Sequence, residues 1–328
     1  MRLVRLLVLL SLIISLVMAA CSPGKQELTP LTLQLKWVHQ AQFAGFYAAA
    51  EQGYYQEEGI DITLQPGGVG IDIVEEVTSG RADVGLIGPE HIIISRSQGV
   101  PIRAIATTYR NNPFVLVSLP DSGITRPADL LGKTVNVDGI DGMIQVRALF
   151  SKLGLDLAQV NIIDYSYDLQ PFWEGDIDAT PAFAAGSLIP IKQQEPDVNL
   201  IWPIDYGIHL YSDTLFTLDE TIQAQPDLLL RFLRASLRGH VYALENPQEA
   251  AEISFSYAEV KDLELQRAML DASIPLVYTG EDEIGWMQDA VWQGMLDILL
   301  EQGFIENNIK VQDVYTMQFL EAVYGEIQ

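Results

Sequence analysis

The first part of the chain alternates between short apolar runs and longer amphipathic segments, a pattern that predicts strands and helices in turn. Residues 31–37 (LTLQLKW) alternate polar and apolar side chains with the period of a strand. Further strands are predicted at 60–65, 84–87, 103–108 and 114–119, and helices at 44–57, at 72–79 and from Pro89 onward. This order predicts an α/β fold in which helices cover both faces of a sheet.

A second unit with the same alternation is predicted to begin near Pro120. Its strands are expected at 134–137, 160–165, after 175–179 and at 199–202, and its helices at 127–133 and 143–153, with a loop at 138–142. Beyond Gly207 the pattern is mostly helical. The economical topology is therefore discontinuous, with lobe one at 31–118 plus 208–328 and lobe two at 119–207. Two crossings between the lobes, near 117–119 and 203–207, would form a hinge beside a cleft.

Residues 1–20 have the organisation of a secretory signal peptide. Two arginines precede a mostly apolar run at 6–17, and small residues precede Cys21. The run is short for a membrane-spanning helix, and no second hydrophobic stretch follows it. Cys21 is the only cysteine, and its place resembles the lipobox of bacterial lipoproteins, where the cysteine is lipidated. Residues 21–30 would then be a lipidated tether that holds the protein at the extracytoplasmic face of the cell membrane.

The acidic composition restricts the partners of the protein. The chain has 19 basic and 44 acidic residues, a net charge of −25 at pH 7, and removal of the two arginines in residues 1–20 makes it −27. Such a surface repels nucleic acid, and it disfavours a strongly anionic ligand unless a local basic pocket exists. About 300 residues is also more than one hydrophobic core usually serves, which agrees with two lobes.

Several motifs occur in an order that is similar to one known superfamily. They are LKWVHQAQFAGFY at 35–47, EQGYY at 51–55, EGID at 58–61, GRADVG at 80–85, LLGKTV at 130–135 and GDIDA at 175–179. Over roughly residues 31–250 the chain resembles the superfamily that includes yeast thiamine-pyrimidine synthase and bacterial binding proteins for thiamine pyrimidines, riboflavin, nitrate or alkylsulfonates. The resemblance implies a two-lobed periplasmic-binding-protein clamshell. It also implies a small-molecule ligand and, as partner, the membrane permease of an ABC importer with its ATPase.

The synthase of this superfamily has a lysine for pyridoxal phosphate, a nearby histidine, a phosphate loop ending in lysine and a cysteine-rich iron site. Here the lysine position holds Ile87, which cannot form a Schiff base. His91 matches the histidine, but the phosphate-loop position at 138–143 has no lysine and the segment 205–211 has no cysteine. The four histidines also lack paired metal-ligand spacing. We therefore expect a binding protein with no cofactor, no metal and no catalytic residue.

Candidate ligand-binding residues are those expected near strand ends that face the cleft. Trp37 ends the first predicted strand, where open α/β sheets present their ligands, although a core tryptophan is an equal interpretation. Glu90 opens a helix after another strand, and aromatic residues of lobe two would stack on a planar ligand. The candidates are Trp37, Gln42, Gly68, Glu90, Asp141, Tyr165, Phe183 and Tyr206.

The best ligand hypothesis is riboflavin. In the pyrimidine-binding branch a glutamate follows the I-D-A turn, and the resemblance places Ala184 at that position. The change removes a polar anchor and opens space, which favours the larger isoalloxazine ring, and the uncharged ribityl chain suits an acidic site. A thiamine-pyrimidine precursor is the alternative. Nitrate or a sulfonate would need a cationic anchor, for which Arg110 is a better candidate than Lys36, because strand alternation points Lys36 away from Trp37.

Overall fold

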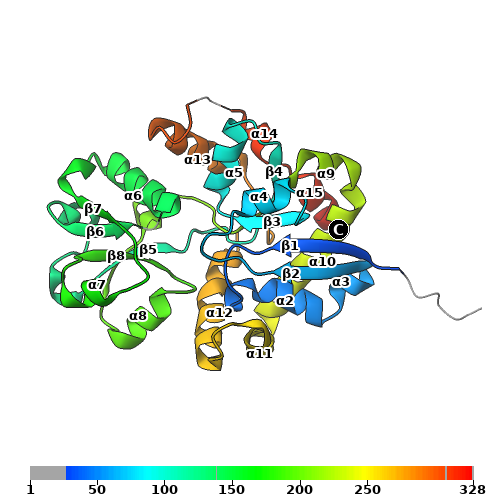
Figure 1. The fold of residues 1–328 in the computed structure, drawn as a ribbon, viewed down its shortest axis with the longest axis horizontal. Coiled ribbons are helices and arrows are strands. Elements are labelled where there is room, and N and C mark those ends of the chain that lie inside the picture. Colours follow the sequence, from blue (N-terminus) through cyan, green and yellow to red (C-terminus); the bar gives the residue numbers. More distant parts are fainter. Residues whose placement is uncertain (1–26, 138, 307–308, 327–328) are drawn as a thin grey trace, which may run out of the picture.

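The computed structural model describes residues 27–137, 139–306 and 309–326. The predicted signal peptide, Cys21 and residues 22–26 of the predicted tether lie outside these ranges. Within them, no helix is both long and apolar enough to cross a membrane. The described chain forms two five-stranded sheets that lie at opposite ends of the molecule, each flanked by helices (Figure 1).

The first-lobe sheet has the strand order β2-β1-β3-β10-β4. Its strands are β1 (Thr29–Gln34), β2 (Ile60–Gln65), β3 (Val84–Ile87), β4 (Ile102–Thr107) and β10 (Thr214–Leu218). β1 pairs in parallel with β2 and β3, whereas β10 is antiparallel to both β3 and β4. The sheet is therefore mixed, and the late strand β10 inserts between two strands from the first third of the chain.

The second-lobe sheet has the order β7-β6-β8-β5-β9. Its strands are β5 (Phe114–Ser118), β6 (Thr134–Val137), β7 (Asn161–Asp164), β8 (Ala179–Phe183) and β9 (Asn199–Ile201). β6 is parallel to β7 and β8, and β5 is antiparallel to β8 and β9. The segments 108–113 and 202–213 connect the two sheets. The lobe boundary expected at 207/208 falls within the second connection. The boundary expected at 118/119 falls after β5, which pairs in the second-lobe sheet, and the division of the chain into lobes stays a prediction.

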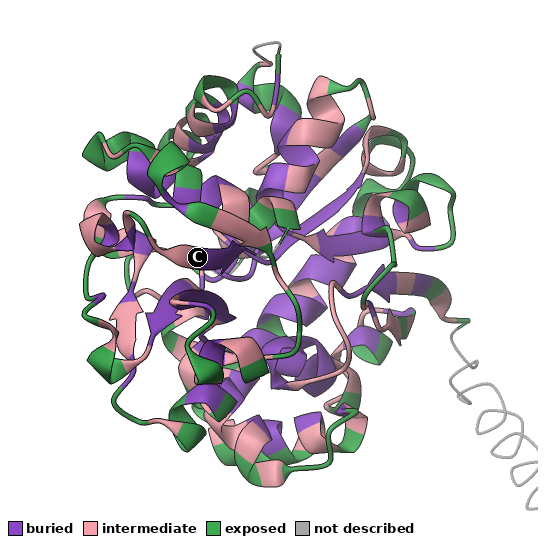
Figure 2. Cartoon of the chain, turned by 60° about the vertical axis from the view of Figure 1, so that its left-hand side comes forward, coloured by how far each residue is buried: buried purple, intermediate pink, exposed green. Residues whose placement is uncertain are grey.

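Helices pack on both sheets, and buried residues concentrate on the strands and on the helix faces that cover them (Figure 2). The α-helices are α2 (Ala44–Glu51), α3 (Tyr54–Glu57), α4 (Ile73–Thr78), α5 (Pro89–Ser97), α6 (Gly139–Leu153), α7 (Gln170–Glu174), α8 (Leu188–Gln194), α9 (Asp219–Ala224), α10 (Pro226–Glu245), α11 (Pro247–Tyr257), α12 (Leu263–Val277), α13 (Asp289–Glu301), α14 (Val311–Val314) and α15 (Gln318–Gly325). Short 3-10 helices occur at Ala41–Phe43, Pro120–Ser122, Pro127–Leu130, Leu157–Gln159 and Pro203–Tyr206.

Helices α2 and α10 approach closely because glycines lie at their contact. A Cβ atom on Gly239 would come within 2.1 Å of the Gly45 carbonyl oxygen. A Cβ atom on Gly45 would come within 2.4 Å of the His240 ring. This contact positions α2, whose N-terminal end follows the loop that carries Trp37 and Gln42.

Three sequence-based expectations about elements were wrong, each for a local reason. β1 ends at Gln34 rather than at residue 37, so the polar and apolar alternation continues beyond the last paired residue. The helix predicted from residue 143 already begins at Gly139, in the segment expected to be a loop. β10 was missed because TLFTL is short and both of its faces are buried. Its polar and apolar residues therefore do not alternate.

Candidate functional site

The candidates of the first lobe come together at one edge of its sheet. The loop after β1 carries Trp37, and β3 directly precedes α5, whose first turn carries Glu90. β10 is antiparallel, so its first residue, Thr214, lies at this same edge opposite Ile87. Asp213, immediately before β10, therefore enters the site although it is distant in sequence. Sequence patterns gave no signal for it because β10 itself was not predicted.

A buried carboxylate organises the first-lobe side of the site. Asp213 is fully buried, and its Oδ2 accepts a hydrogen bond of 2.6 Å from Gln42 Nε2. Its Oδ1 lies 3.2 Å from Lys36 Nζ, and Gln40 Nε2 donates to Gln42 Oε1 at 2.7 Å. Burial lowers the pKa of Lys36, but the charges of Asp213, Asp141 and Glu90 together outweigh it and leave that pKa raised. Lys36 is therefore charged, and its charge is compensated.

Lys36 was expected to point away from the site because of strand alternation, but the strand ends at Gln34. Lys36 lies two residues beyond the strand, and its Nζ is 5.4 Å from the centre of the Phe183 ring in the second lobe. The ring of Phe183 also stacks on Tyr109, with 6.2 Å between centroids and 25° between planes. Lys36 and Phe183 thus bring the two lobes into contact at the sheet edge.

A second contact between the lobes joins the N-terminal turns of α5 and α6. His91 Nε2 lies 2.6 Å from Asp141 Oδ1. Burial raises the pKa of Glu90 to about 8, and the neighbouring charge of Asp141 adds to this effect. Burial lowers the pKa of His91, but its hydrogen bond to Asp141 and the charges of Asp141 and Glu90 prevail and raise it to about 9. Around neutral pH Glu90 is therefore protonated, and His91 and Asp141 form an ion pair.

Within the described residues, Glu90, His91 and Asp141 are also close enough together to hold a metal ion. One ligand atom from each of Glu90, His91 and Asp141 lies within 4.8 Å of the others. The hydrogen bonds from His91 and Glu90 to Asp141 already satisfy these atoms, and a protonated Glu90 is a poor ligand. The trio can therefore bridge the lobes without an ion.

Aromatic side chains from both lobes face each other beside the polar groups. Trp37 of the first lobe stacks on Tyr167 of the second, with 5.8 Å between ring centroids and 26° between planes. The predicted residue Tyr165 contacts Tyr167 edge-on at 5.2 Å and 81°. Tyr167, which sequence reasoning missed, is 62% exposed, so no apolar pattern marked it.

Two of the candidates lie apart from these contacts. The glycine that packs tightly behind Trp37 is Gly67, not Gly68: its N–H donates to the Trp37 carbonyl oxygen at 2.9 Å, and an added Cβ would come within 2.3 Å of the Leu35 oxygen. Gly68 has a φ of +150°, and a Cβ there would meet only Val38, at 3.8 Å. Tyr206 packs against the core of the second lobe.

The cations proposed as anchors for an anion are both paired with carboxylates. Arg110 Nη2 donates to Asp282 Oδ2 at 2.5 Å, and its Nη1 donates to Thr279 Oγ1 at 2.7 Å. Lys36 is paired with Asp213. An anionic ligand would have to compete with these carboxylates.

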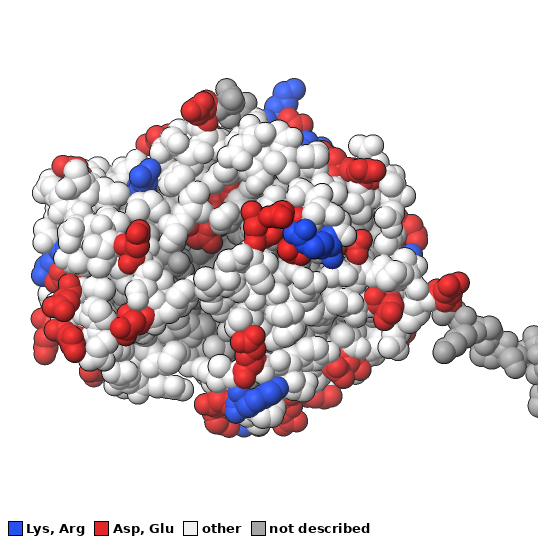
Figure 3. All heavy atoms as spheres, in the orientation of Figure 1, with Lys and Arg blue, Asp and Glu red and all other residues white. Residues whose placement is uncertain are grey.

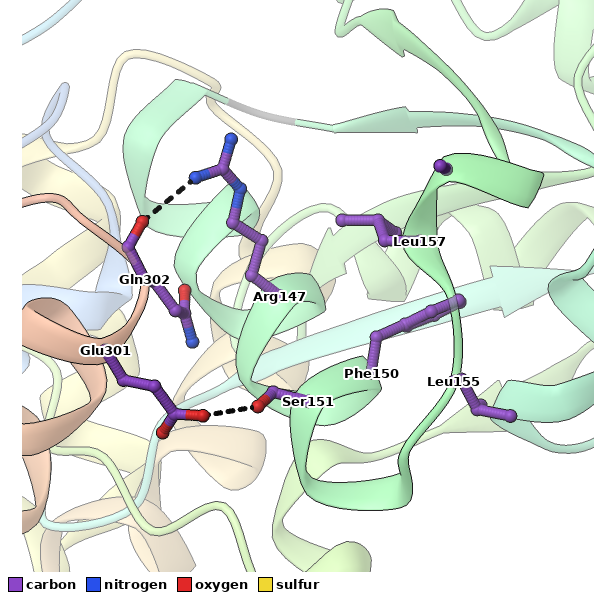
Figure 4. A pocket seen from close by; sticks show the side chains of 8 residues that line it. Arg147, Phe150, Ser151, Leu155, Leu157, Glu301 and Gln302 are labelled. Atoms are coloured by element: carbon purple, nitrogen blue, oxygen red, sulfur yellow. Dashed lines mark hydrogen bonds between the residues drawn. The ribbon is translucent and has the colours of Figure 1, made fainter.

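A separate groove of about 510 Å³ lies between α6 and the C-terminal end of α13 (Figure 4). It is lined by Arg147, Phe150, Ser151, Leu155, Leu157, Ala158, Glu301 and Gln302. Arg147 Nη1 donates to the Gln302 carbonyl oxygen at 3.3 Å, and Ser151 Oγ donates to Glu301 Oε1 at 2.8 Å. The groove contains none of the residues expected from the sequence to bind ligand, and it links the lobes on another side.

Comparison with known proteins gives relatives that cover most of the chain. A riboflavin-binding protein, RibY, from Chloroflexus aurantiacus is 26% identical over 92% of this chain and 89% of its own length. A formylaminopyrimidine-binding protein from Halalkalibacterium halodurans is 23% identical over 89% of this chain and 91% of its own. A 4-amino-5-hydroxymethyl-2-methylpyrimidine phosphate synthase from Legionella pneumophila is 26% identical over 68% of this chain and 72% of its own.

Solved structures share the fold at low sequence identity. The periplasmic aliphatic sulphonate binding protein SsuA from Escherichia coli has a TM-score of 0.71 at 12% identity and covers 87% of this chain and 91% of its own. The two-lobed α/β clamshell expected from the sequence is thereby confirmed. A family model described as NMT1/THI5 like matches residues 40–250, which confirms the superfamily resemblance. The chain belongs to the NMT1/THI5-like family.

Proposed function

We propose that this protein is the solute-binding component of an ABC importer and that its ligand is riboflavin, bound between the two lobes. The proposal rests on one observation: aromatic rings of both lobes and polar groups with compensated charges lie together at one sheet edge. In open α/β sheets ligands bind at such edges. Contributions from both lobes are what a ligand needs in order to favour the closed arrangement.

The charge balance of this edge supports an uncharged ligand. Lys36 is neutralised by Asp213, and His91 is neutralised by Asp141. Arg110 is paired with Asp282. On the face shown in Figure 3, acidic side chains clearly outnumber basic ones. Phosphorylated and sulfonated molecules find no unpaired cation among these groups. Riboflavin is uncharged and does not need one.

The aromatic rings support a planar ligand, because stacked rings add about 0.5–1.5 kcal/mol per pair beyond the burial of their area. We assign Trp37, Tyr165 and Phe183 to stacking or lining, and Gln42, Glu90 and Asp141 to hydrogen bonding. Gly68 and Tyr206 lie apart from these contacts and remain candidates on the sequence argument alone.

The relatives support two vitamin-related ligands. Similarity to the riboflavin-binding protein favours riboflavin, and similarity to the formylaminopyrimidine-binding protein favours a thiamine-pyrimidine precursor. Ala184, 9% exposed and adjacent to Phe183, offers no acceptor for an aminopyrimidine. We therefore rank riboflavin first.

We also propose an extracytoplasmic location, a lipid anchor on Cys21 and delivery of the ligand to a membrane permease with its ATPase. We propose no enzymatic turnover. The apolar side chain of Ile87 stands where the family synthase has its lysine, and a Schiff base requires an amine.

The experiment that tests the ligand is a titration of the mature chain, produced from residue 22 onward without its lipid. Isothermal titration with riboflavin, an aminopyrimidine and ethanesulfonate would compare the three ligand classes directly. Saturable riboflavin binding, together with yellow colour that co-purifies from cells, is expected. Tighter binding of the aminopyrimidine would replace riboflavin by the alternative, and tighter binding of ethanesulfonate would reject both.

A further inference from the structure

The stacked pair of Trp37 and Tyr167 has two properties that set it apart from a core contact. The two residues belong to different lobes: Trp37 follows β1, and Tyr167 lies between β7 and α7. In addition, Tyr167 is 62% exposed, so its ring is accessible to a ligand. An accessible ring that meets a ring of the other lobe points to a role with a ligand.

The two rings already stack on each other, with centroids 5.8 Å apart and 26° between their planes. A flat ligand can lie between them only if the lobes open. The extra separation equals about one more carbon–carbon contact, roughly 3.5 Å. A hinge opening of that size would admit one planar ring system between the two faces.

The two walls of this slot are held differently. Trp37 is fixed, because its carbonyl oxygen accepts from Gly67 N–H and its neighbour Lys36 pairs with buried Asp213. Tyr167 lies on an exposed loop and is supported edge-on by Tyr165, whose N–H donates to the Val137 carbonyl oxygen at 3.1 Å. The first lobe thus presents a wall attached to its sheet edge, and the second lobe presents a wall on an exposed loop.

We propose that Trp37 and Tyr167 sandwich the ligand and that Tyr167 is a specificity-determining residue for flat fused-ring heterocycles. The inference rests on the proposed function and deepens it. Tyr167 touches the ligand only when the lobes close, so its stacking energy favours closure directly. A tetrahedral sulfonate gains nothing from two parallel faces, whereas each face of a fused ring system gains from one.

The test compares Tyr167→Ala, Tyr167→Phe and the control Tyr242→Ala. Tyr242 is on α10, where its ring meets that of Tyr54. Each protein is titrated with riboflavin, lumichrome, an aminopyrimidine and ethanesulfonate. We expect Tyr167→Ala to bind riboflavin and lumichrome about tenfold more weakly, because one stacked face is lost. Tyr167→Phe and Tyr242→Ala should stay within about twofold of the original protein.

The outcomes separate this inference from the riboflavin assignment. Unchanged riboflavin affinity in Tyr167→Ala overturns the sandwich and leaves the function standing. If the original protein binds the aminopyrimidine instead, and Tyr167→Ala weakens that binding, the sandwich stands, but riboflavin and the fused-ring specificity of Tyr167 are wrong. Binding of ethanesulfonate alone, or of none of the four, overturns both. Thermal unfolding of each variant confirms that an affinity loss is not a loss of fold.

Discussion

Closure of the two lobes should depend on pH through the His91–Asp141 pair. Relative to separated side chains in water, the contact raises the pKa of His91 from 6.5 to about 9. A raised pKa means that the closed arrangement takes up a proton, so its contribution is complete below about pH 6.5 and is lost as pH rises through about 9. Glu90 acts with the same sign, because its pKa is raised to about 8 and its ionisation places a second negative charge beside Asp141.

The size of the effect follows from the pKa change and the exposure of the pair. At 1.36 kcal/mol for each tenfold change in proton affinity, the shift of His91 corresponds to about 3 kcal/mol as an upper limit. The side chains of His91 and Asp141 are 35% and 50% exposed, so solvent screening reduces the pair to roughly 1 kcal/mol. The closed population should therefore fall about fivefold relative to the open one between pH 7 and pH 10.

Small-angle X-ray scattering of the ligand-free protein measures this change as an increase in the radius of gyration. Asp141→Asn keeps the shape of the side chain but removes its charge, so the variant should be more open at pH 7 and should respond less to pH. Measurement without ligand keeps the proposed contact of Asp141 with ligand out of the result. The other groups that act on the pair, Glu90 and Lys36, are present in both proteins. A radius independent of pH from 6 to 10 in the original protein, or a His91 pKa below 7 by NMR, would refute the reasoning.

Four further predictions concern the wall of the site, the anchor and catalysis. Trp37→Ala should weaken riboflavin binding by roughly 1–3 kcal/mol and leave the unfolding temperature nearly unchanged, and a large loss of stability would instead identify Trp37 as a core residue. Gly67→Ala should cost about 1–3 kcal/mol of stability by denaturant unfolding, because its Cβ would lie 2.3 Å from the Leu35 oxygen, and unaltered unfolding would contradict that packing. Cys21→Ser should release the protein from the membrane fraction or block precursor processing, whereas normal processing and partitioning would count against the anchor. Incubation with pyridoxal phosphate and iron should yield no pyrimidine by mass spectrometry, and stoichiometric product would revive the synthase.

The sequence alone was enough for the fold class and for most elements. The alternation of polar and apolar residues located β1, and glycine and proline residues marked the ends of several helices. Both signals depend on local backbone geometry. Trp37, Gln42 and Glu90 were expected near strand ends for the same reason, and the structure places them together at one edge of the first-lobe sheet. The family resemblance rested on ordered motifs and needed no structure.

Tertiary structure decided the contacts between residues that are distant in sequence. Asp213 joins Lys36 and Gln42 only because β10 inserts antiparallel between β3 and β4, which no local pattern predicts. Tyr167 meets Trp37 only when the two lobes face each other. The sequence thus determined the elements through local backbone preferences, whereas the tertiary structure decided which charges compensate one another and which rings stack, because both depend on distances across the cleft.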